Sequence, residues 1–358
     1  MYTVLQYTGE YITAAYYLVR GDTLIVWGGG DPGTKYPYLA SESPFINFLK
    51  KTDKTIVFSD SHFHTQRFGD GWAWDDYPFS YQSERTAFPI YGNQLRVERQ
   101  QDTIFLTPAY FNLVFTSRRD TIQKLTRNEW GTQYHYQYNY RIPESVSTIP
   151  VSLYENDIRF IWKEATGKEI FFKDVPFIRN ALRIDGTKRD TLLKWMMHES
   201  DNFIAEQLLL SCALSQTGSM NEKNIIRKML IGPLAQLPDS ISWVDGSGLS
   251  RYNLMTPRSV IWVLNKMLAE RGVDYLKTMF PAGGKSGTLR DLFKSDDDQA
   301  YIFAKSGTLR HTYCLSGLLI TRDGRVLLFS WMNNHFNHDS SDIKMSMDIF
   351  LKYIRDHY

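Results

Sequence analysis

Near the C-terminus, two β-rich runs are joined by a short turn, and this hairpin constrains the fold more than any other stretch. The runs cover residues 313–321 and 326–332. The linking residues Arg322-Asp323-Gly324-Arg325 contain an Asp-Gly pair, which is the strongest short-range hairpin signal. Directly ahead of the hairpin stands Ala304-Lys305-Ser306-Gly307-Thr308-Leu309. The pattern therefore predicts an antiparallel sheet with Lys305 on a strand at its edge, facing a cleft.

Two interpretations of Lys305 follow from this position. A lysine surrounded by hydroxyl side chains suits the capture of a carboxylate. A lysine on an exposed edge strand also prevents unwanted pairing with other strands, without any ligand. The segment alone leaves both interpretations open.

Charge and cysteine content exclude several classes of protein. The chain has 358 residues, with 41 basic and 39 acidic side chains, so a nucleic-acid-binding surface is not expected. Cys212 and Cys314 are too few for a disulfide framework or a cysteine metal site. No transmembrane segment is expected, because no run approaches eighteen consecutive apolar residues.

No signal peptide is expected from the first residues, since residues 1–5 lack a basic region followed by an apolar core. Taken alone, this absence predicts a cytoplasmic protein. The chain also begins abruptly, because residues 16–27 already have the pattern of a strand. We therefore expect residues 1–30 to be an N-terminal remnant of a longer protein.

The region from residue 31 to about 150 has a mostly β pattern and is interpreted as an inserted module. Residues 134–140 alternate aromatic and polar side chains with the period of a half-buried strand. The glycines at 28–30 do not indicate a dinucleotide loop, because Asp31-Pro32 breaks the chain where its helix would start. His62 and His64 could share one face of a strand, but no third ligand has convincing spacing, so no metal or cofactor is predicted.

From residue 151 the pattern changes to amphipathic helices, and this part is predicted as a second domain, 151–358. Ser200-Asp201-Asn202 stands between two of these helices. Ser, Asp and Asn are all common helix N-caps, so a purely structural role is one interpretation of this triplet.

Two short motifs thus follow one another, Ser-Asp-Asn at 200–202 and Lys-Ser-Gly-Thr at 305–308. Serine acyl-transferases that bind penicillin use such a pair, after a first motif Ser-x-x-Lys. Beyond these motifs, the chain from Asp31 onward resembles a D-alanyl-D-alanine carboxypeptidase/endopeptidase of the penicillin-binding-protein-4 type. The segments that carry the resemblance are residues 29–32, 71–76, 199–206, 245–251 and 304–309.

The resemblance implies an α/β (α+β) fold: a transpeptidase domain like that of penicillin-binding proteins and serine β-lactamases, with an antiparallel sheet flanked by helices and a large β-rich insert. It also implies roles for particular residues. Ser200 would relay a proton, Asn202 would hold the substrate amide, and Lys305 would attract the terminal carboxylate. Ser306 and Thr308 would donate hydroxyl hydrogen bonds, and Gly307 would let the substrate backbone approach closely.

The chain departs from the family pattern at the nucleophile. No Ser-x-x-Lys precedes residue 200, and the one match, at 341–344, follows Lys305 in the predicted C-terminal helix, where Ser340 or Ser341 better serves as a cap. A near-duplicate Lys-Ser-Gly-Thr at 285–288 is predicted to form a loop. We therefore expect a chain that binds but does not acylate, either because its N-terminus is missing or because it is a non-catalytic homologue.

The resemblance further implies partners and a location. Partners would be peptidoglycan stem peptides ending in D-Ala-D-Ala and β-lactams, and the protein would work in the periplasm or elsewhere outside the cytoplasm. An unrelated aromatic-rich carbohydrate-binding module is disfavoured, because it leaves both motifs unexplained.

Overall fold

A five-stranded mixed sheet forms one end of the molecule. The computed structural model describes residues 1–39, 43–118, 122–139 and 141–358. In the sheet the strand order is β10-β3-β2-β1-β11, with β1 antiparallel to its neighbours and β3 parallel to both of its own. The bounds are β1 Tyr11–Arg20, β2 Thr23–Gly28, β3 Thr55–Ser59, β10 Ile170–Phe172 and β11 Leu182–Lys188, with α2 Pro44–Lys51 and α3 Glu155–Thr166 packed on it.

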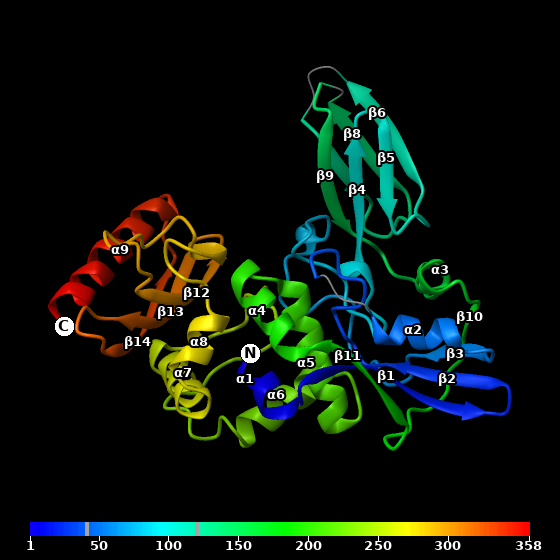
Figure 1. Cartoon of the computed structure of the whole chain (residues 1–358), viewed down its shortest axis with the longest axis horizontal. Helices are drawn as coiled ribbons and strands as arrows, with labels where there is room; N and C mark the ends of the chain where they lie inside the picture. The colour runs from blue at the N-terminus through cyan, green and yellow to red at the C-terminus, as the bar shows by residue number, and fades with distance from the viewer. Residues whose placement is uncertain (40–42, 119–121, 140) are drawn as a thin grey trace.

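A β-rich module projects from this body at the top of Figure 1. It contains two three-stranded sheets, β5-β4-β9 and β6-β8-β7. Tyr134 and Tyr136 are fully buried, which confirms the alternating pattern predicted there, while Tyr140 lies outside the described residues. The strands are β4 Gln94–Gln100, β5 Thr103–Thr107, β6 Leu113–Arg118, β7 Lys124–Arg127, β8 Tyr134–Asn139 and β9 Glu144–Pro150, and short 3₁₀ turns η1 Trp74–Asp76 and η2 Tyr91–Asn93 precede them.

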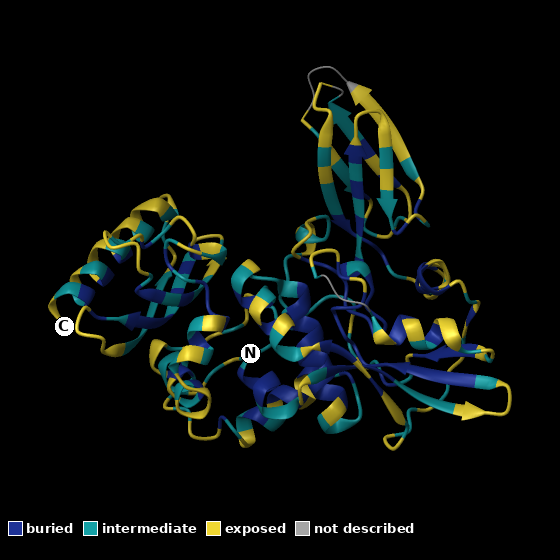
Figure 2. Ribbon diagram, viewed as in Figure 1, coloured by how far each residue is buried: buried dark blue, intermediate teal, exposed yellow. Residues whose placement is uncertain are grey.

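Helices occupy the middle of the molecule, between the two ends that carry sheets (Figure 1). The helix α5 is apolar on almost every side and is the most deeply buried of them (Figure 2). Local caps set several boundaries: Asn221 caps α6 and Thr256, followed by Pro257, caps α7. The bounds are α1 Tyr2–Tyr7, α4 Arg189–Glu199, α5 Asn202–Thr217, α6 Glu222–Ile231, α7 Pro257–Arg271 and α8 Val273–Met279.

The predicted hairpin forms the other end of the molecule as an antiparallel sheet of order β12-β13-β14. Its strands are β12 Ile302–Leu309, β13 Thr312–Ile320 and β14 Val326–Asn334. Gly324 turns the chain with a φ of 83°, in the left-handed region that glycine adopts without steric cost. The helix α9, Ser340–His357, packs on β13 through Met347 and Leu351, and α7 packs against β13 and β14.

The structure confirms the predicted fold class, because an antiparallel sheet is flanked by helices and a β-rich module is attached. One detail is wrong: Asp339, not Ser340 or Ser341, caps α9, because its carboxylate accepts a hydrogen bond from Ser341 N. The predicted divisions at residues 30 and 150 stay predictions.

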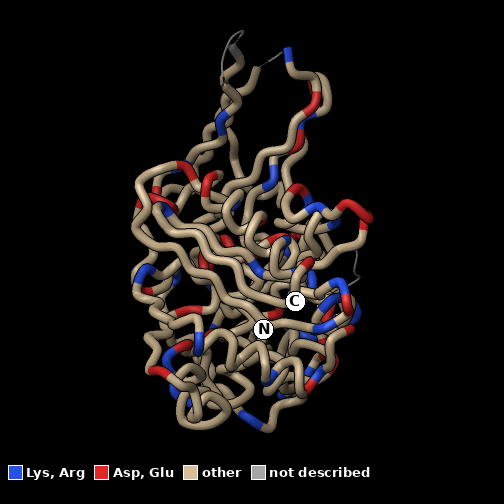
Figure 3. The backbone as a smooth tube through the Cα atoms, turned by 90° about the vertical axis from the view of Figure 1, so that its left-hand side faces the viewer, with Lys and Arg blue, Asp and Glu red and all other residues tan. Residues whose placement is uncertain are grey.

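Positions of basic and acidic residues are interspersed along the backbone (Figure 3). This distribution agrees with the near balance of 41 basic and 39 acidic residues. Within the described part of the chain, no helix is long and apolar enough to cross a membrane.

Candidate active site

The Ser-Asp-Asn triplet forms the tight connection between α4 and α5. Ser200 ends α4 with φ 56° and ψ 47°, a left-handed conformation that is uncommon for residues other than glycine. Asp201 then caps α5, because its carboxylate accepts a hydrogen bond from Ile204 N at 2.9 Å. The capping role is therefore real, but it belongs to Asp201 and leaves the side chains of Ser200 and Asn202 for the cleft.

Asp201 is also anchored from the side away from the cleft. Its second carboxylate oxygen accepts hydrogen bonds from the Tyr36 hydroxyl and from Trp195 Nε1. Burial raises the pKa of this carboxyl, although the hydrogen bonds from Ile204 and Tyr36 oppose the shift. The anchors hold the turn rigidly, and a strained residue at such a turn is typical of functional sites.

The outer edge of β12 is paired only along its first part. Gly283 N donates to Ile302 O at 2.9 Å, and Ala304 N donates to Pro281 O at 3.0 Å. Among the described residues, no backbone group pairs with this edge beyond residue 304. Because backbone groups alternate in direction along a strand, those of Ser306 and Thr308 point toward this open edge.

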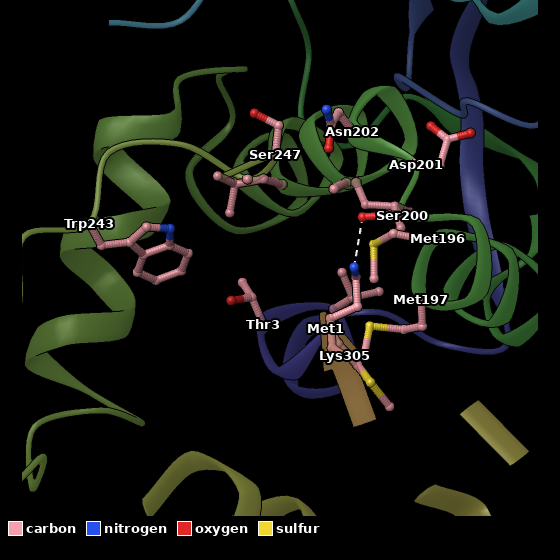
Figure 4. Close-up of a pocket in the computed structure, with 15 residues that line it drawn as sticks. Met1, Thr3, Met196, Met197, Ser200, Asp201, Asn202, Trp243, Ser247 and Lys305 are labelled. Atoms are coloured by element: carbon pink, nitrogen blue, oxygen red, sulfur yellow. Dashed lines mark hydrogen bonds between the residues drawn. The ribbon is translucent and has the colours of Figure 1, made fainter. Parts of the chain in front are cut away.

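Lys305 extends from β12 to the Ser-Asp-Asn turn. Its Nζ lies 2.6 Å from Ser200 Oγ and 2.5 Å from the carbonyl oxygen of Ser306 (Figure 4). No carboxylate forms an ion pair with Lys305 anywhere in the ranges that the structure describes. Desolvation by the surrounding protein lowers the pKa of Lys305 to about 8 from its ordinary value of 10.5. A half-buried ammonium group without a counter-ion would be stabilised by a bound anion, so this position is chemically suited to one.

A cleft of about 930 Å³ opens beside this pair of motifs. All six residues predicted from the sequence as site residues line it: Ser200, Asn202, Lys305, Ser306, Gly307 and Thr308. The structure thus brings together two motifs that are more than 100 residues apart in the sequence. Asn202 Nδ2 donates to the Tyr81 carbonyl oxygen at 3.2 Å, which links the α5 end of the cleft to the segment that precedes the β-rich module.

The cleft also has lining residues that were not predicted from the sequence as site residues. They are Asp75, Asp76, Tyr81 and Arg251. Burial, together with a hydrogen bond to Asp76, raises the pKa of Tyr81 to about 12. The only signal for Asp75 and Asp76 in the sequence is that they lie in the segment 71–76, which carries part of the family resemblance.

A buried carboxylate on α5 holds part of the lining of the cleft. Glu206, one turn after Asn202, is paired with Arg85 at 2.9 Å and accepts hydrogen bonds from Gly246 N and Ser247 N. Burial raises the pKa of Glu206, while the charge of Arg85 opposes the shift. Ser247 lines the cleft and the neighbouring pocket together with Ser200, so this network holds the backbone of one lining residue.

That neighbouring pocket, about 210 Å³ in volume, lies on the inner side of Lys305. Met1, Thr3, Met196 and Met197 border it, and Figure 4 shows the three methionines beside Lys305. The Ser-x-x-Lys match at 341–344 lies instead in the first turn of α9, at the outer side of the molecule (Figure 1). It contributes nothing to the cleft.

Comparison with known proteins identifies the region that holds both motifs. Residues 188–354 match the profile of the D-Ala-D-Ala carboxypeptidase 3 (S13) family. Residues 188–354 are thus similar to the S13 family. The relationship to penicillin-binding-protein-4-type D-Ala-D-Ala carboxypeptidases that the sequence predicted is therefore confirmed.

Individual relatives agree with the family. A D-alanyl-D-alanine carboxypeptidase, DacB, from Haemophilus influenzae is 30% identical over 177 residues, which is 47% of this chain and 36% of the relative. Carboxypeptidase DacB from Mycolicibacterium smegmatis is 28% identical over 151 residues, or 40% of this chain and 33% of the relative. The matched regions thus span only about a third of these relatives.

The fold likeness extends further than the sequence likeness. The crystal structure of penicillin-binding protein 4 from H. influenzae superposes with a TM-score of 0.75 and 19% identity, covering 99% of this chain and 90% of that one. A second structure of that protein, in complex with a β-lactam, gives a TM-score of 0.67 at 18% identity, with 99% and 89% covered. The β-rich module is thus part of the shared fold.

Proposed function

We propose that this chain forms the substrate cleft of a serine-type D-Ala-D-Ala carboxypeptidase/endopeptidase, which acts on peptidoglycan stem peptides. One observation carries the proposal: the Lys305 ammonium group is half-buried beside Ser200, and no described carboxylate neutralises it. The terminal carboxylate of a D-Ala-D-Ala peptide would supply the missing negative charge. The names of the S13 relatives support this choice of ligand.

Each residue at the cleft has a distinct chemical role in the proposal. Lys305 attracts the carboxylate, and the hydroxyl groups of Ser306 and Thr308 donate hydrogen bonds to it. Gly307 has no atom within 4 Å of the position that a Cβ would occupy, so a substrate backbone can approach the strand. Thr308 N–H, which points to the open edge, is placed to form one half of an oxyanion hole.

Ser200 and Asn202 act at the other side of the scissile bond. The Ser200 hydroxyl, held by Lys305, passes a proton between the attacking serine and the leaving amine. Asn202 hydrogen-bonds the amide of the residue ahead of the bond. The attacking serine would form an acyl-enzyme that water hydrolyses.

Among the described residues, no serine of a Ser-x-x-Lys motif lines the cleft. No Ser-x-x-Lys precedes Ser200 in the sequence, and Met1, Met196 and Met197 line the pocket beside Lys305. We infer that this polypeptide binds D-Ala-D-Ala peptides and β-lactams without being acylated. A binding protein that performs no chemistry is the second candidate, and it is favoured by the same observation.

The first test separates binding from acylation. Wild-type protein is titrated with a short peptide ending in D-Ala-D-Ala and with its C-terminal amide, followed by NMR. Binding of the acid but not of the amide supports the proposal, and equal or absent binding of both contradicts it. Covalent labelling by fluorescent penicillin would contradict the inferred absence of a nucleophile.

The second test distinguishes the two candidates. A Ser-x-x-Lys segment joined directly ahead of Met1 would extend α1 by about 6 Å into the pocket beside Lys305. Penicillin labelling of this variant, but not of one carrying Ala-x-x-Lys, supports an enzyme cleft. Retained peptide binding without labelling supports the non-catalytic candidate.

Location and further ligands follow from the same proposal. Peptidoglycan lies outside the cytoplasm, so we propose a periplasmic or otherwise extracytoplasmic site of action. β-Lactams carry a carboxylate at the equivalent position and should compete with the peptide. Displacement of bound peptide by penicillin in the NMR titration tests this point.

A further inference from the structure

The upstream Lys-Ser-Gly-Thr copy lies directly against the cleft. It belongs to a loop that begins at Pro281–Gly283, where the chain pairs with the first part of β12. The loop then passes through the 3₁₀ turn η3, Gly287–Leu289, which packs on α4 and β12. Thr288 lines the cleft together with Lys305.

Thr288 contacts one of the proposed carboxylate-binding hydroxyls. The Ser306 Oγ lies 2.8 Å from Thr288 Oγ1 and donates a hydrogen bond to it. Without such a partner, the hydroxyl of Ser306 could rotate freely about its Cβ–Oγ bond. The contact joins the fourth residue of the upstream copy to the second residue of the downstream copy.

The loop is too tightly held to leave Thr288 free to move away. Gly287 has a φ of 57°, and a Cβ at this position would lie 2.6 Å from the His198 carbonyl oxygen on α4. Ala282 N donates to Ser286 Oγ at 3.1 Å, which closes the loop, and Leu289 is fully buried in the core beneath β12. Thr288 is thus presented from a fixed backbone.

We propose that Thr288 is a positioning residue for carboxylate binding, acting through Ser306. A serine hydroxyl has one proton and two lone pairs. When a carboxylate binds, the Ser306 hydroxyl donates its hydrogen bond to the ligand. The Thr288 hydroxyl then rotates and donates a hydrogen bond to Ser306 Oγ. The upstream copy thereby keeps Ser306 aligned and polarised for the ligand. This inference rests on the proposed function of Lys305 and Ser306.

The chemistry predicts which replacements matter. Thr288→Val keeps the shape of the side chain but removes the hydroxyl, and we expect the affinity for a D-Ala-D-Ala acid to fall roughly three- to tenfold. Thr288→Ser restores the hydroxyl and should restore the affinity. Lys285→Ala is the matched control, because Lys285 pairs with Asp298 outside the cleft.

The experiment is an NMR titration of the full chain with a D-Ala-D-Ala peptide acid and its amide. The decisive comparison is Thr288→Val in the wild-type background and in a Ser306→Ala background. A loss that disappears when Ser306 is already absent supports the proposal. Equal affinity of Thr288→Val and wild type, or an equal loss in both backgrounds, overturns it. If wild type binds neither ligand, the proposed function fails first, so the two failures are distinguishable.

Discussion

Two copies of Lys-Ser-Gly-Thr-Leu, at 285–289 and 305–309, have opposite structures in this protein. The downstream copy is a β-strand paired along its whole length with β13, whereas the upstream copy is a loop with one 3₁₀ turn. Lys305 extends into the cleft to Ser200, but Lys285 pairs with Asp298 at the surface. The surroundings of each copy, above all the pairing of residues 305–309 with β13, therefore determine its structure.

The largest expected difference between the copies concerns their lysines. Lys305→Met should lower the affinity for a D-Ala-D-Ala acid by about 10- to 100-fold, because a charge-assisted contact is lost. Lys285→Met should leave it unchanged. Calorimetric titration of both variants measures the contrast, and similar losses in the two would show that the surroundings do not separate them.

For the glycines of the two copies we expect the reverse: the upstream glycine should matter for stability, and the downstream glycine for ligand binding. Gly287→Ala places a Cβ against the His198 carbonyl oxygen in a left-handed conformation, so we expect a loss of about 2 kcal/mol or more in unfolding free energy. Gly307→Ala should change it by no more than about 0.5 kcal/mol but should hinder ligand binding. Urea denaturation measures both, and a stable Gly287→Ala protein would contradict the tight docking of the loop.

Only the downstream lysine should make binding pH-dependent near neutrality. The pKa of Lys305 is lowered from 10.5 to about 8, so the ammonium group is mostly charged below pH 8 and loses its charge above it. Acid-peptide affinity should be flat from pH 6 to about 7.5 and fall up to tenfold per pH unit above 8. Between pH 8 and 10.5 the unfolded state binds more protons, so this lysine should make stability rise with pH.

Titration with the peptide acid and with its amide at each pH separates the effect of pH on ligand affinity from its effect on protein stability. The amide, which carries no charge for Lys305 to attract, is the control. An acid affinity that stays constant up to pH 10 would contradict the assigned shift.

The smallest expected effect is at the second position of the motif. Ser306→Thr adds a methyl group and keeps the hydroxyl, so the affinity should change by less than about twofold. Ser286→Thr in the upstream copy provides the matching change outside the ligand contacts. A large loss in Ser306→Thr would show that the serine is required for fit beside Thr288.

Local sequence signals predicted most of the separate elements. The Asp-Gly turn predicted the hairpin, and Gly167, with a φ of 71°, ends α3 in the left-handed conformation that is common for a glycine after a helix. The Ser200–Lys305 contact could be anticipated only through the family resemblance, because 105 residues separate the two side chains.

Other features depend on tertiary contacts that leave no local trace. The parallel pairing of β3 with β10 joins residues 55–59 to residues 170–172 across the whole β-rich module. Asp75 and Asp76 line the cleft together with Ser200 and Lys305, which lie more than 120 residues further along the chain. Neither feature has a periodicity or spacing that a single sequence displays.

The half-closed edge of β12 also sets a direction for anything that binds along it. Pro281–Gly283 occupies the edge as far as Ala304, and the remainder is open. A peptide that pairs with the open part would be blocked beside Lys305 by residues 281–283. The end of such a peptide would therefore lie at a fixed position, and only an extended segment could pair with the strand.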